Sequence, residues 1–203
     1  MRRIGLAAGL VMSVLVVTAA PALADPGDLD LGFGGTGHVS AVVAGNQDGV
    51  DVAVRPNGRV IVASAGGTVA QFLANGDPDP GFGTGGVVPA PGGISIHAIA
   101  LDADGNLVLA GSQGNDVFVE RLLTNGDPDP AFNGTGSLTT HLGRPTFADD
   151  VAVGPHGRIV VAGALGFTNG RFLVVRYLPG GALDPGFGGD GKVSTPILGN
   201  DFA

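Results

Sequence analysis

The sequence predicts an all-β protein in which tandem four-stranded antiparallel repeats form a partial β-propeller of about three blades. The first observation is a recurring loop, "NGDPDPGFGTGG" at 75–86 and "NGDPDPAFNGTG" at 125–136, with weaker copies at 27–37 and 180–191. The second is a tight turn that recurs in step with the loop, as "RPNG", "DADG" and "GPHG". The third is an apolar run after each turn, "RVIVAS", "LVLAGS" and "RIVVAG". A β-solenoid is the alternative, but its rungs are usually shorter than these units of about 50 residues.

Residues 1–24 are predicted to be a secretory signal peptide and not part of the fold. Arg2 and Arg3 precede an apolar run of 14 residues at 4–17, and Ala22-Leu23-Ala24 forms a small-x-small cleavage site. A membrane anchor is the alternative, although about 20 apolar residues are needed to span a bilayer. We therefore expect a protein that is secreted or located at the cell envelope, without stable membrane insertion after cleavage.

Residues 25–203 are predicted to be one repeat domain, with units at roughly 38–86, 87–136 and 137–191 and the start of a fourth unit after them. The loop phenylalanines that mark these units, Phe33, Phe82, Phe132 and Phe187, are spaced by 49, 50 and 55 residues. Each unit is expected to contain four strands, because short Val-, Ile- and Leu-rich runs alternate with turn residues. In chain order the expected strands are 38–44, 50–54, 59–64 and 69–74, then 86–89, 96–101, 107–112 and 117–123, then 137–142, 149–153, 158–163 and 172–178.

The tight turn is expected to join the second and third strands of each unit. It places Gly58, Gly105 and Gly157 directly before the third strand, and an Asn-Gly or Asp-Gly pair at this point favours a hairpin. The third strand is a continuous apolar run, which predicts burial on both faces. A blade sandwiched between two other blades provides that environment.

The recurring loop is interpreted as the joint between neighbouring blades. An Asp lies three residues before each loop Phe, at Asp30, Asp79, Asp129 and Asp184, where its carboxylate can accept backbone N–H groups and fix the turn. The proline at 80, 130 and 185 restricts φ and stiffens the loop. We therefore expect the Phe to fill the seam between two blades, where its burial contributes ~1.5–3 kcal/mol.

The units resemble the delta-60 repeat, a bacterial β-propeller-like repeat of exported and surface proteins. The resemblance is strongest in the third unit, through 151–153, 157–163, 175–178 and 183–193, and covers nearly all of the mature chain. Unit one departs from it, with Gln71 where the other units have Arg121 and Arg176. The resemblance implies the propeller fold and export, and it implies no particular reaction.

Calcium is the competing interpretation of the loop. Asp77 and Asp79, and likewise Asp127 and Asp129, are paired carboxylates in Gly-rich loops, and Ca²⁺ takes 6–8 oxygen ligands. The spacing is too short for an EF-hand, and the third copy has Ala182 in place of the first acid. We expect no cofactor, with these four aspartates as weak calcium candidates.

No arrangement of residues nominates a catalytic site, so we expect a protein that is not an enzyme. The four histidines lack zinc-ligand spacing, and Ser64 and Ser112 lack a nucleophile elbow. Glu120 is the only glutamate, so a pair of catalytic carboxylates would need two aspartates. The histidines, His38, His97, His141 and His156, are scattered, and His156 is expected in an exposed turn. Four charged residues of the strands are interpreted as strand-end or surface charges: Asp51, Asp150, Arg121 and Arg176.

Charge and composition restrict the partners. Without Arg2 and Arg3 the chain has 8 basic and 18 acidic residues, a formal charge of −10, which argues against nucleic acid. There is no Cys, so stability must come from packing and not from disulfides. The expected function is an exported, non-catalytic repeat module that binds or scaffolds an unknown extracellular or envelope ligand. A hydrolase with its site in the propeller channel and a calcium-stabilised surface module are the alternatives.

Three units are too few to close a propeller, because known propellers have 4–8 blades. Open ends leave unpaired strand edges and an apolar blade face, both of which favour association. We therefore expect either self-association or a longer parent chain.

Overall fold

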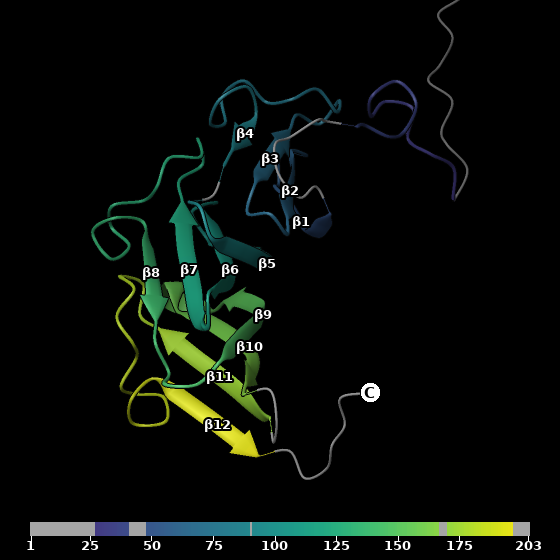
Figure 1. The fold of residues 1–203 in the computed structure, drawn as a ribbon. Coiled ribbons are helices and arrows are strands. Elements are labelled where there is room, and N and C mark those ends of the chain that lie inside the picture. Colours follow the sequence, from purple (N-terminus) through teal and green to yellow (C-terminus); the bar gives the residue numbers. More distant parts are fainter. Residues whose placement is uncertain (1–26, 41–47, 90, 167–169, 197–203) are drawn as a thin grey trace, which may run out of the picture.

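The computed structural model describes residues 27–40, 48–89, 91–166 and 170–196, which form three consecutive four-stranded antiparallel sheets (Figure 1). Sheet 1 comprises β1 (Gly49–Val54), β2 (Val60–Ser64), β3 (Val69–Phe72) and β4 (Val87–Val88). Sheet 2 comprises β5 (Ile94–Leu101), β6 (Leu107–Gln113), β7 (Asp116–Leu122) and β8 (Ser137–Thr140). Sheet 3 comprises β9 (Thr146–Val153), β10 (Ile159–Leu165), β11 (Arg171–Tyr177) and β12 (Lys192–Pro196). The chain is therefore a partial β-propeller with three blades, as predicted.

The three sheets stack face to face, with their first strands on one side of the stack. Strand β1 lies beside β5, and β5 lies beside β9, as Figure 1 shows. Two apolar clusters fill the spaces between the sheets. One joins sheets 1 and 2 around Ile61, Phe82 and Leu109, and the other joins sheets 2 and 3 around Phe132 and Tyr177. The core thus lies in two seams between sheets.

The predicted grouping of strands into units is wrong by one strand. The segments that we expected to open the second and third units instead pair at the edge of the preceding sheet, β4 with β3 and β8 with β7. In the same way β12, which we expected to begin a fourth unit, completes sheet 3. Each recurring loop turns the chain back onto the strand that it has just left, so it connects strands of one sheet and does not link two sheets.

The expected first strand at 38–44 is not a strand where the structure describes it. Residues 38–40 have no regular secondary structure, and the rest of this segment lies outside the described residues, as does the expected signal peptide at 1–24. In the described parts of the chain, no helix is long and apolar enough to cross a membrane. The one helical element there is a 3₁₀ turn, η1 (Pro155–Gly157).

The tight turns lie where they were predicted, between the first two strands of each sheet. Gly58 and Gly105 both have φ of 80° and Gly157 has φ of 70°, a conformation that glycine adopts without steric cost. His156 also has a positive φ, of 62°, and is exposed in its turn, as expected from the sequence.

Burial of the apolar run on both faces is confirmed only in the middle sheet. Leu107 to Gly111 of β6 are all buried, because sheet 2 is covered on both sides. In β2 and β10 buried residues alternate with partly exposed ones over the apolar run. The expectation fails in sheets 1 and 3 because, within the described residues, each has a neighbouring sheet on one side only.

Candidate functional site

Each recurring loop is fixed by its aspartate, as predicted. One carboxylate oxygen, Oδ1, accepts the backbone N–H two residues later, at 2.9 Å in all four copies. The four acceptors are Asp30, Asp79, Asp129 and Asp184. The loop phenylalanines of the two inner seams, Phe82 and Phe132, are fully buried, which confirms that they fill the seams between sheets.

The second carboxylate oxygen binds a side chain from the third strand of the same sheet. Arg121 Nε donates to Asp129 Oδ2 at 2.7 Å, and Arg176 Nε donates to Asp184 Oδ2 at 2.8 Å. The interpretation of these arginines as surface or strand-end charges is therefore wrong. We call each aspartate together with its third-strand partner a loop clamp.

Sheet 1 builds its loop clamp from different residues. Gln71 Nε2 donates to Asp79 Oδ2 at 2.7 Å, so the glutamine occupies the position of the arginines in the other sheets. Arg55, at the end of β1, donates from Nε to Gln71 Oε1 at 2.7 Å, and Arg59 Nε lies 2.8 Å from Asp79 Oδ2. Two cations thus compensate for the missing arginine. The sequence contained this signal, because Gln71 is accompanied by arginines where sheet 2 has Asp102 and Asn106.

The clamp carboxylates of sheets 1 and 3 are held in their charged form. Burial alone would raise the pKa of Asp79, but hydrogen bonds from Gly81 and Gln71 and the charge of Arg59 outweigh burial and lower it. Burial acts in the same direction on Asp184, whose pKa is nevertheless lowered by the Gly186 N–H and by its two arginines. A protonated clamp would lose these bonds, so acid should loosen the loops.

In the two closed seams the clamp also reaches the next sheet. Arg121 Nη1 donates to the Pro179 carbonyl at 2.9 Å, across the seam between sheets 2 and 3. Arg55 Nη1 donates in the same way to the Gly105 carbonyl, across the seam between sheets 1 and 2. The guanidinium therefore joins neighbouring sheets by binding a backbone carbonyl oxygen.

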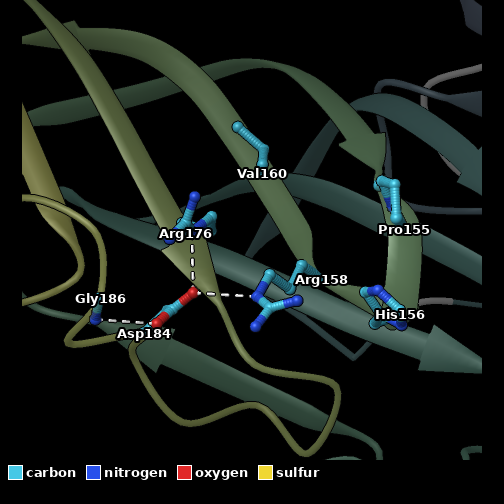
Figure 2. Close-up of a pocket in the computed structure, with 8 residues that line it drawn as sticks. Pro155, His156, Arg158, Val160, Arg176, Asp184 and Gly186 are labelled. Carbon is cyan, nitrogen blue, oxygen red and sulfur yellow. Dashed lines mark hydrogen bonds and ion pairs between the residues drawn. The ribbon is translucent and has the colours of Figure 1, made fainter.

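The clamp of sheet 3 is open to solvent and forms the candidate site (Figure 2). Arg176 and Arg158 both approach Asp184 Oδ2, at 2.8 and 3.2 Å, and the dashed lines in Figure 2 converge on this carboxylate. The pocket around them measures about 510 Å³ and also includes His156. Two guanidinium groups against one carboxylate leave a net positive charge, which suits a carbonyl or carboxylate oxygen as ligand.

The equivalent pocket in sheet 1 shows what covers such a clamp. It measures about 240 Å³, and Thr124 and Asn125 of sheet 2 form part of its wall. The loop Phe of sheet 3 reflects the same difference: Phe187 is only partly buried, with the Arg176 guanidinium 4.6 Å from its ring centre. The open pocket is thus the uncovered form of a site that a neighbouring sheet covers elsewhere.

The four calcium candidates are engaged with protein groups. Asp79 and Asp129 direct both oxygens to the clamp donors described above. Asp77 and Asp127 are exposed and accept hydrogen bonds from the side chains of Asn75 and Asn125, at 2.8 and 2.7 Å. No group of three or more His, Cys, Asp or Glu side chains that could hold a metal ion occurs among the described residues.

The histidines and serines are not brought together. His97 Nδ1 lies 2.7 Å from the Ala148 carbonyl across a seam, and His141 Nδ1 lies 2.7 Å from Asp116 at the surface. His38 is exposed near the start of the described chain. Ser64 Oγ accepts the Thr68 N–H at 3.2 Å, and Ser112 Oγ is buried without a hydrogen-bond partner among the described residues.

The two strand aspartates have different surroundings. Asp51 Oδ1 accepts the Val52 N–H at 2.7 Å, and its Oδ2 accepts the Ile99 N–H of sheet 2 at 2.8 Å, so this residue is a seam contact and not a surface charge. Asp150 occupies the equivalent position in sheet 3. Its Oδ1 accepts the Val151 N–H at 2.8 Å, and the residue is exposed, as expected.

Glu120 is a buried carboxyl group that the sequence did not single out as unusual. It lies in β7 on the face of sheet 2 that packs against sheet 1, where the equivalent positions carry Ala70 and Val175. Burial raises the pKa of Glu120 to about 7. The clear sequence signal was a lone acid inside the apolar run "VFVERLL".

Comparison with known proteins agrees with this architecture. Residues 103–132 and 155–187 match a family described as a domain of unknown function, DUF5122, with a β-propeller fold. No curated protein matches the chain.

Solved structures with a similar arrangement include a protein of unknown function from Bacteroides caccae, at 16% identity and a TM-score of 0.46, over 74% of this chain and 46% of that one. Virginiamycin B lyase from Staphylococcus aureus is similar at 11% identity and a TM-score of 0.42, over 76% of this chain and 57% of the lyase. The chain thus spans about half the length of these structures.

Proposed function

We propose that this β-propeller repeat chain is an exported, non-catalytic scaffold module of the delta-60 repeat type. It acts at or outside the cell envelope of a bacterium by docking its sheets onto a protein partner. The observation that carries the proposal is the open clamp of sheet 3. The same guanidinium position in sheet 2 binds a backbone carbonyl of the neighbouring sheet.

Polypeptide is the ligand class that this chemistry favours. Arg158 and Arg176 present donors for carbonyl or carboxylate oxygens. On the same sheet face as the clamp, the apolar residues Phe172 and Val193 are exposed. A face that combines apolar side chains with carbonyl-binding cations suits another protein surface.

The proposal is tested by cell fractionation with Phe172→Asp as the variant. The wild-type chain is expected in the envelope fraction, and Phe172→Asp is expected in the culture medium, because a charge on the face prevents docking. Ala182→Asp is the matched control. It adds the same charge to an exposed position of sheet 3 where the other two loops carry aspartate, and it should remain in the envelope fraction.

Two results would contradict the proposal. One is an identical distribution of wild type and Phe172→Asp. The other is turnover of a hydrolase substrate by the purified chain that a single Asp→Asn change on β1 or β9 abolishes, which would favour a catalytic site in the channel.

A further inference from the structure

Every sheet has two faces that differ in their residues and in what covers them. We call the front face the one formed in sheet 1 by Ala53, Ile61, Ala63 and Val69, and in the other sheets by their equivalents. The back face is formed in sheet 1 by Val52, Val54, Val60 and Val62. The front of sheet 1 packs on the back of sheet 2, and the front of sheet 2 packs on the back of sheet 3. One type of contact, front to back, therefore occurs twice within the chain.

One front face and one back face have exposed apolar residues in the described structure. On the front of sheet 3, Phe172 is 64% exposed, and Val160 and Val174 are partly exposed, whereas their sheet 2 equivalents are fully buried. On the back of sheet 1, Val52 is 58% exposed and Val54 is 62% exposed. The equivalents of these valines in the other sheets lie in the seams. Among the described residues, the front of sheet 3 is thus exposed, and the back of sheet 1 is exposed at β1.

The front face of sheet 3 also carries the polar groups that bond across the seams between sheets. In the closed seams the N–H groups of Gly83 and Asn133 donate across the seam to the carbonyls of Asn125 and Gly180, at 2.8 and 2.9 Å. Gly188 is their equivalent in sheet 3 and faces no acceptor among the described residues. Asp150, the counterpart of Asp51, likewise uses only Oδ1 within sheet 3.

We propose that the front face of sheet 3 binds the back face of sheet 1 in a second copy of this chain. The inference rests on the proposed scaffold function and names its partner. The back face of sheet 1 in a second copy matches the front face of sheet 3 in the first, and the front face of sheet 3 in the second copy matches the back face of sheet 1 in the first. Two copies joined head to tail at both ends bring six sheets into one ring, within the range of 4–8 blades of known propellers.

One segment of the chain already occupies part of the back of sheet 1. Residues 27–40 place the Gly34 N–H 2.7 Å from the Asn75 carbonyl, which is the contact that Gly188 of a second copy would make. Val39 packs directly on Gly76. This segment is loosely held, since Leu29 is 61% exposed and Leu31 is 67% exposed. Dimerisation therefore requires that the segment leave the position that the loop at Phe187 takes.

The test is light scattering on the purified chain 25–203 over a range of concentrations. Wild type is expected at twice the protomer mass, and Phe172→Asp and Val52→Asp are each expected to weaken dimerisation roughly tenfold or more, because each charge is placed in an apolar seam. An equimolar mixture of the two variants retains one intact front-to-back contact. It should therefore form a heterodimer, while each variant alone stays monomeric. Ala182→Asp should behave as wild type.

Val39→Asp tests the proposal independently. It weakens the hold of residues 27–40 on sheet 1, so dimerisation should become tighter. A monomeric wild type, or variants that do not complement each other in the mixture, would overturn the second copy as partner. A monomeric wild type combined with release of Phe172→Asp from the envelope would leave the scaffold function intact and assign the face to another protein. A dimeric wild type, combined with an unchanged cell fractionation of Phe172→Asp, would support the second copy as partner and contradict the scaffold function at the envelope.

Discussion

At the residue scale, the loop phenylalanine is the most informative position, because the same side chain lies between two sheets in two copies of the loop and on an exposed sheet face in a third. Phe82 and Phe132 are fully buried, whereas Phe187 is only partly buried. The same substitution should therefore have different costs at positions that the sequence repeat makes equivalent.

Replacing Phe82 or Phe132 with Ala should lower the free energy of unfolding by ~3–5 kcal/mol, because each change leaves a cavity in a seam. Phe187→Ala should cost roughly 1–2 kcal/mol, since less of the ring is buried. Urea denaturation of the three variants measures the difference. Asp77→Ala is the control and should cost less than either buried Phe, because this aspartate is exposed. Equal losses at Phe82 and Asp77 would indicate that the loop is built around a ligand of the acids.

Glu120 predicts an unusual dependence of stability on pH. Its folded pKa is raised to about 7 by burial, above the value of an unfolded glutamate. Between these two pKa values the folded state keeps a proton that the unfolded state has lost. Stability therefore falls as pH rises through this window, by up to ~3 kcal/mol, and the loss is complete above pH 7. The lowered pKa values of Asp79 and Asp184 act oppositely, and destabilise the fold only in stronger acid.

Urea denaturation at pH 5 and pH 8 measures this effect. Wild type should be less stable at pH 8, and Glu120→Gln should remove most of the difference. Glu120→Val, which introduces the residue found at the equivalent position of sheet 3, should be more stable than wild type at pH 8. If Glu120→Gln kept the full wild-type difference between the two pH values, the titration would belong to another group.

At the element scale, each sheet has an irregular register where its first strand passes the second. Beside this point Ile96 pairs with Gly111, Ala148 pairs with Gly163, and Gly49 pairs with Ser64. A Cβ at Gly111 or Gly163 would lie 1.9 Å from a carbonyl oxygen of the opposite strand. In sheets 2 and 3 the two backbones approach so closely that the second strand carries a glycine at this point. Sheet 1 lacks this close approach: the equivalent residue is Ser64, and a Cβ at its partner Gly49 would meet no atom closer than 3.7 Å.

Gly163→Ala should therefore destabilise the fold by ~2 kcal/mol or more, because the backbone of β9 must move away from β10. Thermal unfolding followed by circular dichroism measures the effect. Gly92→Ala is the control, since a Cβ there meets nothing within 4 Å, and its melting temperature should be unchanged or slightly higher. A Gly163→Ala variant as stable as Gly92→Ala would contradict the close approach.

The repeat pattern predicted most strand positions and the tight turns, because hydrogen bonding in hairpins is local. It did not predict that the expected first strand of the next unit completes the preceding sheet, because the strand that follows each loop could pair with either sheet. The clamp was predicted only in part. The aspartate with its backbone bond follows from local turn chemistry, whereas the pairing with Arg121 or Arg176 depends on the return of the chain beside the third strand. The seam contacts of Asp51 and Arg55 depend on the packing of whole sheets.

At the scale of the whole molecule, the described residues form a stack of three sheets with an exposed front on sheet 3 and a back on sheet 1 that residues 27–40 cover only in part. The two internal seams show that such faces bind each other through apolar side chains and the backbone of the loop, and the seam between sheets 1 and 2 also uses Asp51 of the first strand. The central claim is that the same contact forms between two copies.

The most direct measurement is a site-specific disulfide across that contact. Asp51 Oδ2 bonds to the Ile99 N–H in the internal seam, so the corresponding positions between copies are 150 and 52. The natural chain has no cysteine, so introduced thiols can pair only with each other. In the variant with Asp150→Cys and Val52→Cys, mild oxidation should give a covalent dimer linked between positions 52 and 150, identified by peptide mapping. The variant with Asp51→Cys and Ile99→Cys is the control and should close within one chain. If the control disulfide forms, and the test variant stays monomeric or links only like positions, the head-to-tail ring is contradicted.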